Sequence, residues 1–79
     1  MSKDKPSRTE QMIITRVQAA LRVGRKTTVD GVRVKGIRFR DSELEVEWDA
    51  EVQDDIRWSV VQPNYLHEFD NGELELKTH

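Results

Sequence analysis

The sequence contains no cysteine, so no disulfide and no zinc site with cysteine ligands can cross-link this chain of 79 residues. Hydrophobic residues are also few, at 35% of the chain, which leaves only a thin core for one small domain. Small domains without cross-links often gain stability by self-association. We predict a polar, disordered arm over residues 1–6 and a single domain over residues 7–79. Because this domain has no cross-links, we expect it to favour a homo-oligomer.

Long apolar runs are missing as well. No segment approaches the roughly 20 residues that a membrane-spanning helix needs, and residues 1–7 hold no apolar stretch of the kind found in signal peptides. These absences predict a cytoplasmic or intravirion protein that does not bind a membrane.

The residues that usually carry catalysis form no recognisable set. There is no Ser/His/Asp combination and no glycine-rich phosphate loop. His67 stands alone and His79 is terminal, whereas a metal site needs several converging ligands. Glu43, Glu45 and Glu47 share one side of a predicted strand, but they face arginines and lack the pocket that acid–base catalysis needs. We therefore expect a binding protein rather than an enzyme, with no metal, no cofactor and no small-molecule substrate.

Charge is divided unevenly along the chain. Residues 1–40 hold eleven Lys and Arg against three acids, a net charge of +8. Residues 41–79 hold two bases against twelve acids, a net charge of −10. This division indicates either a basic half that faces nucleic acid or two halves that neutralise each other after folding.

The first element is predicted to be an amphipathic helix over residues 8–23. Ser7 and Glu10 have the spacing of a capping box, in which each side chain accepts a hydrogen bond from a free backbone amide of the first turn. Apolar residues then recur at helical spacing from Ile13 to Leu21, where the helix would face the core.

After the helix the apolar period changes to two, which indicates strands. Asp30-Gly31 is typical of a tight hairpin turn. The phase of the next strand slips by one residue at Gly36, as it does at a β-bulge, so we predict a sharply bent strand.

A two-residue turn at Asp41-Ser42 predicts an antiparallel hairpin of residues 32–40 with residues 43–49. Basic side chains of the first strand then face glutamates of the second, with Arg38 opposite Glu45. Opposed charges on a sheet stabilise it by about 0.2–1 kcal/mol per pair. We interpret this basic strand as a set of cross-strand ion pairs rather than as a phosphate site.

Later segments complete the predicted sheet. Residues 56–60 alternate with Ile56, Trp58 and Val60 facing inward, and Asn71-Gly72 predicts a final tight hairpin. The predicted fold class is mainly β with one N-terminal α-helix, arranged as a small, strongly bent antiparallel barrel.

Residues 29–41, VDGVRVKGIRFRD, resemble a pattern of the Sm-like family, which includes the bacterial Hfq kind: a turn glycine, a second glycine at a strand bend and an aspartate that ends the strand. The resemblance covers residues 8–63 and implies a barrel of Sm-like or Src-homology-3-like type that can form rings. The family's second motif, which carries its RNA-contacting residues, has no match around residues 57–62. The resemblance therefore names no RNA contacts in this chain.

A basic surplus remains near the N-terminus when the sheet ion pairs are set aside. Residues 1–26 carry seven bases against Asp4 and Glu10, a net charge of +5. Cations that neutralise phosphates supply most non-specific affinity for nucleic acid. The candidate nucleic-acid contacts are Lys3, Lys5, Arg8, Arg16, Arg22, Arg25 and Lys26.

The hairpin around Asn71-Gly72 carries a second candidate surface. A two-residue turn there would place Asp70 opposite Glu73 and Glu68 opposite Glu75. Like charges directly opposite each other destabilise a sheet. We therefore predict that a basic surface covers this acidic face, supplied by the helix arginines, by a neighbouring copy or by a partner protein.

The tryptophans offer a third candidate surface. Trp48 and Trp58 both alternate inward, so both are predicted to lie in the core. The alternative is that Trp58 lines an aromatic groove with Pro63 and Tyr65, of the kind that small barrels use to bind proline-rich peptides.

Two functions follow from these patterns. The favoured one is a non-enzymatic protein-interaction module that associates with itself or with a partner protein through complementary basic and acidic faces. The alternative is a nucleic-acid-binding regulator, for RNA or DNA, that uses the basic arm and helix, although the acidic second half would repel phosphate. A third option is that the acidic half mimics nucleic acid and occupies a basic protein.

Overall fold

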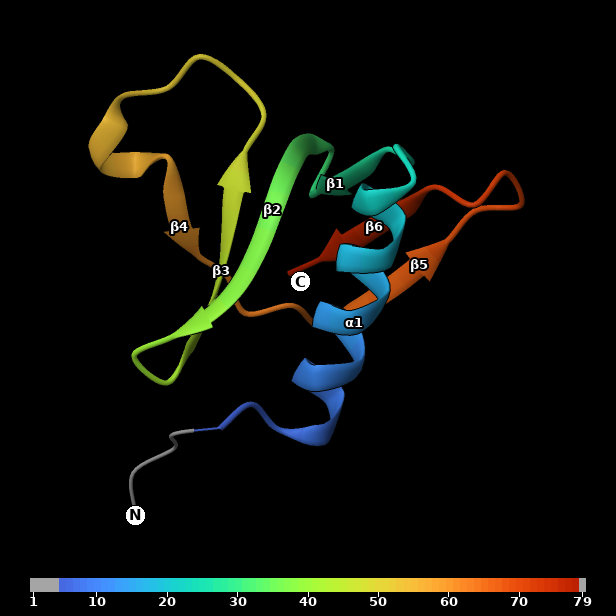
Figure 1. Cartoon of the computed structure of the whole chain (residues 1–79), viewed down its shortest axis with the longest axis horizontal. Helices are drawn as coiled ribbons and strands as arrows, with labels where there is room; N and C mark the ends of the chain where they lie inside the picture. Colours follow the sequence, from blue (N-terminus) through green and yellow to red (C-terminus); the bar gives the residue numbers. More distant parts are fainter. Residues whose placement is uncertain (1–4, 79) are drawn as a thin grey trace.

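The computed structural model describes residues 5–78, which form one α-helix and a six-stranded sheet (Figure 1). Residues 1–4, which include Lys3 and most of the predicted arm, and residue 79 lie outside the described residues. The elements are α1 (Arg8–Arg22), β1 (Thr27–Val29), β2 (Val32–Arg40), β3 (Glu43–Trp48), the 3-10 helix η1 (Asp54–Ile56), β4 (Trp58–Val60), β5 (Tyr65–Glu68) and β6 (Leu74–Lys77).

The predicted capping box starts α1. Ser7 Oγ accepts a hydrogen bond from the backbone N–H of Glu10 at 3.1 Å, and Glu10 Oε1 accepts one from the backbone N–H of Ser7 at 2.8 Å. The helix ends at Arg22, one residue before the predicted end, because Val23 leaves the helical conformation and acts as the C-cap.

The sheet confirms the mainly β class but is not closed into a barrel, so this part of the prediction is wrong. Its strand order is β4-β3-β2-β1-β6-β5, and β1 pairs with β6 in parallel, whereas the prediction was fully antiparallel. Pro63 has no backbone N–H to donate to a β-ladder, and β4 ends shortly before it, at Val60. Residues 61–64 then carry the chain to the opposite edge, where the backbone N–H of Asn64 donates to the carbonyl oxygen of Lys77 at 2.6 Å.

The predicted bend in β2 is confirmed. The register with β3 shifts between Val34 and Gly36, as expected for a bulge. Arg38 lies opposite Glu45, and its Nε donates to a carboxylate oxygen of that residue at 2.6 Å. The turn at Asp30-Gly31 is also confirmed, because both residues have the positive φ angles, 50° and 88°, that this two-residue hairpin turn requires.

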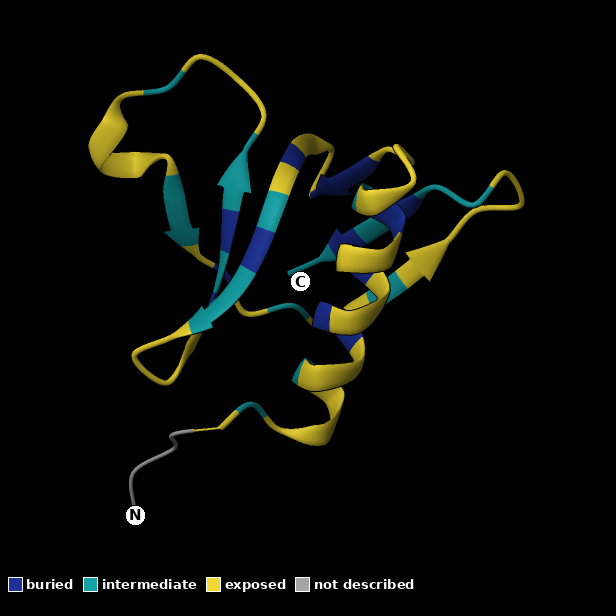
Figure 2. Cartoon of the chain, in the orientation of Figure 1, coloured by how far each residue is buried: buried dark blue, intermediate teal, exposed yellow. Residues whose placement is uncertain are grey.

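The core lies between α1 and the concave side of the bent sheet (Figure 2). The helix contributes Ile13, Val17 and Ala20 to one side of the core, and strands β1, β2, β3 and β6 contribute most of the other side. Within residues 5–78, no helix is both long and apolar enough to cross a membrane.

Candidate functional site

The last hairpin is shifted by one residue from the predicted register. Glu68 lies opposite Leu74, and His67 lies opposite Glu75. The reason is the turn: a two-residue turn needs positive φ at both Asn71 and Gly72, but only Gly72 has it, at 87°. The loop therefore holds three residues, and the backbone N–H of Gly72 donates to the carbonyl oxygen of Phe69 at 2.9 Å.

This shift divides the predicted acidic face. Glu68 lies on the helix side of the hairpin, where it forms an ion pair with Arg16 of α1. Glu75 lies on the opposite side of the sheet, with Lys77 Nζ 3.4 Å from its carboxylate. One helix arginine thus covers Glu68, as one of the predicted options had it, but Glu68, Asp70, Glu73 and Glu75 do not form a single face.

Trp58 is not a core residue, and the predicted inward phase of residues 56–60 is wrong. Trp58 lies opposite Glu47 on the outer side of the sheet, half-buried beneath the guanidinium of Arg38, whose carbon is 3.9 Å from the ring centroid. Ser59 points inward instead, because its Oγ accepts a hydrogen bond from Nε1 of Trp48 at 2.8 Å.

The structure does not bring the predicted aromatic groove together. Trp58 lies in β4 at one edge of the sheet, and Tyr65 lies in β5 at the opposite edge. Pro63 is in the connection between them and lines a separate hollow with the N-terminal end of α1. The three side chains therefore share no surface.

The basic residues predicted to contact nucleic acid lie in different surroundings. Lys5, Arg8 and Arg22 are exposed and make no ion pair with any residue of the range 5–78. Arg25 folds over the last hairpin, since a Cβ added at Gly72 would lie only 2.9 Å from its guanidinium.

Lys26 immediately precedes β1, and its carbonyl oxygen accepts a hydrogen bond from the backbone N–H of Leu74 at 3.0 Å. It lines a hollow with Glu73 and Glu75 on the outer side of the sheet. Lys26 is therefore separated from Lys5 and Arg8 at the N-terminal end of α1.

A cleft runs between the N-terminal half of α1 and strand β5, with a volume of about 430 Å³. Its apolar side chains are Met12, which is 45% exposed, and the half-buried Leu66. Tyr65 also borders the cleft, but it precedes Leu66 in β5 and its side chain therefore faces the other side of the sheet. The Arg16–Glu68 ion pair lies at the same cleft. The cleft is lined by Thr9, Met12, Ile13, Arg16, Asn64, Tyr65, Leu66 and Glu68.

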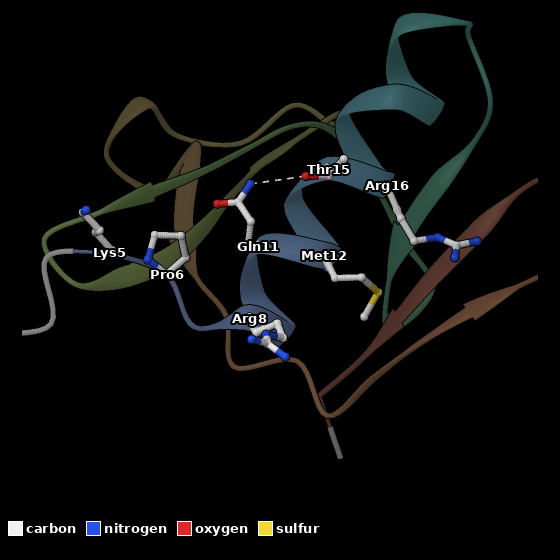
Figure 3. A pocket seen from close by; sticks show the side chains of 7 residues that line it. All are labelled: Lys5, Pro6, Arg8, Gln11, Met12, Thr15 and Arg16. Carbon is white, nitrogen blue, oxygen red and sulfur yellow. Dashed lines mark hydrogen bonds between the residues drawn. The ribbon is translucent and has the colours of Figure 1, made fainter.

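A second, open hollow continues from this cleft across the exposed side of α1 (Figure 3). Met12 and Arg16 belong to both, and Figure 3 shows these two side chains pointing toward the β5–β6 side. The hollow has a volume of about 710 Å³ and is lined by Lys5, Pro6, Arg8, Gln11, Met12, Thr15 and Arg16. We call the cleft and the hollow together the α1–β5 surface.

Strand β5 also leaves a backbone edge unpaired beside this surface. In β6, the backbone N–H of Leu74 donates to the carbonyl oxygen of Lys26, and the carbonyl oxygen of Leu76 accepts from the N–H of Asp30. Backbone groups alternate in direction along a strand, so those of Glu75 and Lys77 point toward β5. By the same alternation, the N–H and C=O groups of Leu66 and Glu68 point away from the sheet. No described residue pairs with this edge.

Comparison with protein-family models, curated proteins and solved structures found no match for this chain. The resemblance to the Sm-like family therefore stays a prediction from residues 29–41. Among residues 5–78, no three His, Asp or Glu side chains are grouped so that they could hold a metal ion.

The sequence patterns identified three residues of the α1–β5 surface in their basic role, Lys5, Arg8 and Arg16. They also identified Glu68, as part of an acidic face, and Tyr65, in a different groove. They missed Met12 and Leu66. Met12 had a signal, because it is an apolar residue on the helix face otherwise occupied by Arg8 and other polar residues. No sequence signal identified Leu66, because the side of the sheet that it faces depends on the exact register of the last hairpin.

Proposed function

We propose that this chain is a non-enzymatic protein-interaction module that binds another protein, or another copy of itself, at the α1–β5 surface. The observation that carries the proposal is the juxtaposition of an apolar cleft and an unpaired strand edge. A strand edge offers main-chain hydrogen bonds to an added segment, and neighbouring pockets provide specificity.

The make-up of the surface supports a protein ligand. Exposed Met and other apolar side chains are typical of the centres of protein interfaces, whereas charged groups are typical of their rims. Met12 is 45% exposed in the free chain and Leu66 is half-buried beside it, with Arg8 and the Arg16–Glu68 pair around them. A partner that covers the two apolar side chains would remove their area from water, which favours binding.

Site-specific photo-cross-linking tests the proposal. The variant Met12→p-benzoylphenylalanine is expected to form adducts with a protein, which mass spectrometry then identifies as another copy or as a partner. The matched control is Val23→p-benzoylphenylalanine, because Val23 is 66% exposed near the end of α1 and lines neither part of the α1–β5 surface.

Reconstitution from purified proteins completes the test. Met12→Gln is expected to weaken binding of the identified protein at least ten-fold, whereas Val23→Gln leaves it within two-fold. Equal adducts at the two positions, or equal effects of the two substitutions, would contradict the proposal.

A second candidate function is favoured by the exposed side of α1. It presents Arg8, Arg16 and Arg22, and the only acid of the helix, Glu10, is used in the capping box. Such a face suits contacts with nucleic-acid phosphates, although Glu68 already neutralises Arg16.

Fluorescence anisotropy with generic RNA and DNA at 50 and 200 mM salt tests this candidate. If it holds, Arg8→Ala and Arg22→Ala each weaken binding by a similar factor for all sequences and flatten the salt dependence. Absence of binding by the wild-type chain at 50 mM salt would exclude it.

A further inference from the structure

The loop between β3 and β4 lies far from the α1–β5 surface. Residues 49–57 form this loop, which includes η1, and Figure 1 shows it at the upper left, whereas the N-terminal half of α1 is at the bottom and β5 is on the right. The chain extends 40 Å along its longest axis, so a single copy presents the loop and the α1–β5 surface to different neighbours.

The loop combines uncompensated negative charge with an apolar side chain. Glu51 and Asp55 are exposed and form no ion pair with any residue of the range 5–78. Asp54, by contrast, is bound by Arg57 at 2.7 Å. Ile56, next to Asp55, is 49% exposed, which places a large apolar side chain beside the free carboxylates.

The α1–β5 surface has the complementary composition. Lys5 and Arg8 form no ion pair with any residue from 5 to 78, whereas Arg16 already binds Glu68. The exposed Met12 and the half-buried Leu66 are its apolar side chains. An acidic, apolar segment therefore fits this surface better than a basic one does, and the chain itself carries such a segment.

We propose that the α1–β5 surface of one copy binds the loop of residues 49–57 of a second copy. The inference rests on the proposed function, since it uses the same surface and names its occupant. Opposite charges steer the two parts together and fix their orientation. Burial of Ile56 against Met12 and Leu66 then supplies the apolar centre of the contact.

The contact is heterologous, because the two complementary parts are different regions of the chain. Each copy can receive the loop of one neighbour and insert its own loop into another, so the assembly grows beyond a dimer as concentration rises. This property separates the proposal from a symmetric dimer, in which the same patch meets itself.

Two variants test the proposal, each with one charge and one apolar side chain replaced. The surface variant is Arg8→Gln with Met12→Gln, which keeps good helix formers in α1. The loop variant is Asp55→Asn with Ile56→Gln. All four side chains are exposed, so both variants should keep the wild-type circular dichroism and thermal unfolding.

Sedimentation velocity over 10 μM to 1 mM chain gives the readout. Wild-type chain is expected to associate progressively, and more weakly when salt rises from 50 to 500 mM. Each variant alone should associate at least ten-fold more weakly. An equimolar mixture of the two should form a species of about twice the 9.3 kDa chain mass and nothing larger. The reason is that the surface variant still has a wild-type loop and the loop variant still has a wild-type α1–β5 surface, so only one kind of contact can form, between one copy of each.

Any of the following results would overturn the inference: wild-type chain that stays monomeric at 1 mM, variants that associate as the wild type does, or a mixture of variants that stays monomeric. A wild-type chain that assembles only after RNA or DNA is added would also overturn it. None of these removes the proposed function if the cross-linker at position 12 captures a different protein that rebinds in purified form. The two claims therefore fail separately.

Discussion

Thr27 places a hydroxyl group in the core without a hydrogen-bond partner. The residue is fully buried, and Oγ1 bonds to no group in the described range. It lies on the helix side of β1, opposite the buried Leu74. Leaving a buried polar group unsatisfied costs about 1–3 kcal/mol. Thr27→Val replaces the hydroxyl by a methyl group of similar size, so we expect the free energy of unfolding to rise by about 1–2 kcal/mol.

Urea unfolding followed by circular dichroism measures this change. A rise of 1 kcal/mol corresponds to roughly 4–8 °C in melting temperature for a domain of this size. Thr28→Val is the matched control, because it makes the same exchange on the neighbouring residue, which faces the other side of the sheet, and no unsatisfied buried group is found there. The reasoning fails if Thr27→Val destabilises the fold or if the two substitutions have equal effects.

Three further predictions concern stability. Ser7→Ala removes half of the capping box and should lower the free energy of unfolding by about 1 kcal/mol in urea titrations, whereas Ser7→Asp should restore it. Gly72→Ala should cost about 1–2 kcal/mol in the same assay, because its φ of 87° disfavours a side chain and the new Cβ would displace Arg25. A double-mutant cycle of Arg16→Gln and Glu68→Gln should give a coupling energy of at most about 1 kcal/mol, because both side chains are nearly half exposed. Added salt should reduce this coupling energy. A coupling energy that salt leaves unchanged would contradict an exposed ion pair.

Local signals along the sequence predicted much of the fold. The capping box at Ser7, the turn at Asp30-Gly31, the bulge at Gly36 and the pairing of Arg38 with Glu45 were all predicted and are all confirmed. Each depends on residues close together in the chain, where glycine conformations and turn lengths restrict the alternatives.

Longer-range pairings could not be predicted in this way. The parallel pairing of β1 with β6 joins residues more than 40 positions apart, and no local pattern specifies it. The phase of β4 was wrong because Ser59, a polar residue, faces inward to bond Trp48. The last hairpin was wrong by one residue because Asn71 does not adopt the positive φ that its turn preference suggested.

These errors changed the candidate site more than the fold. The slipped hairpin turned Glu68 toward Arg16 and so divided the predicted acidic face. The same slip turned Leu66 toward α1, where it lines the cleft with Met12. The basic helix was predicted from composition alone, but the apolar part of the α1–β5 surface required the register.

The central claim is that the α1–β5 surface is where this chain meets another protein chain. Amide chemical shifts of ¹⁵N-labelled chain, followed as unlabelled chain is added from 10 μM to 1 mM, test it most directly. The account predicts shifts that saturate together at Met12, Tyr65 and Leu66 and in residues 49–57, with Val32, an exposed residue of β2, unchanged. Spectra that do not change with concentration would contradict the association of copies, and shifts confined to residues outside the α1–β5 surface would contradict the central claim.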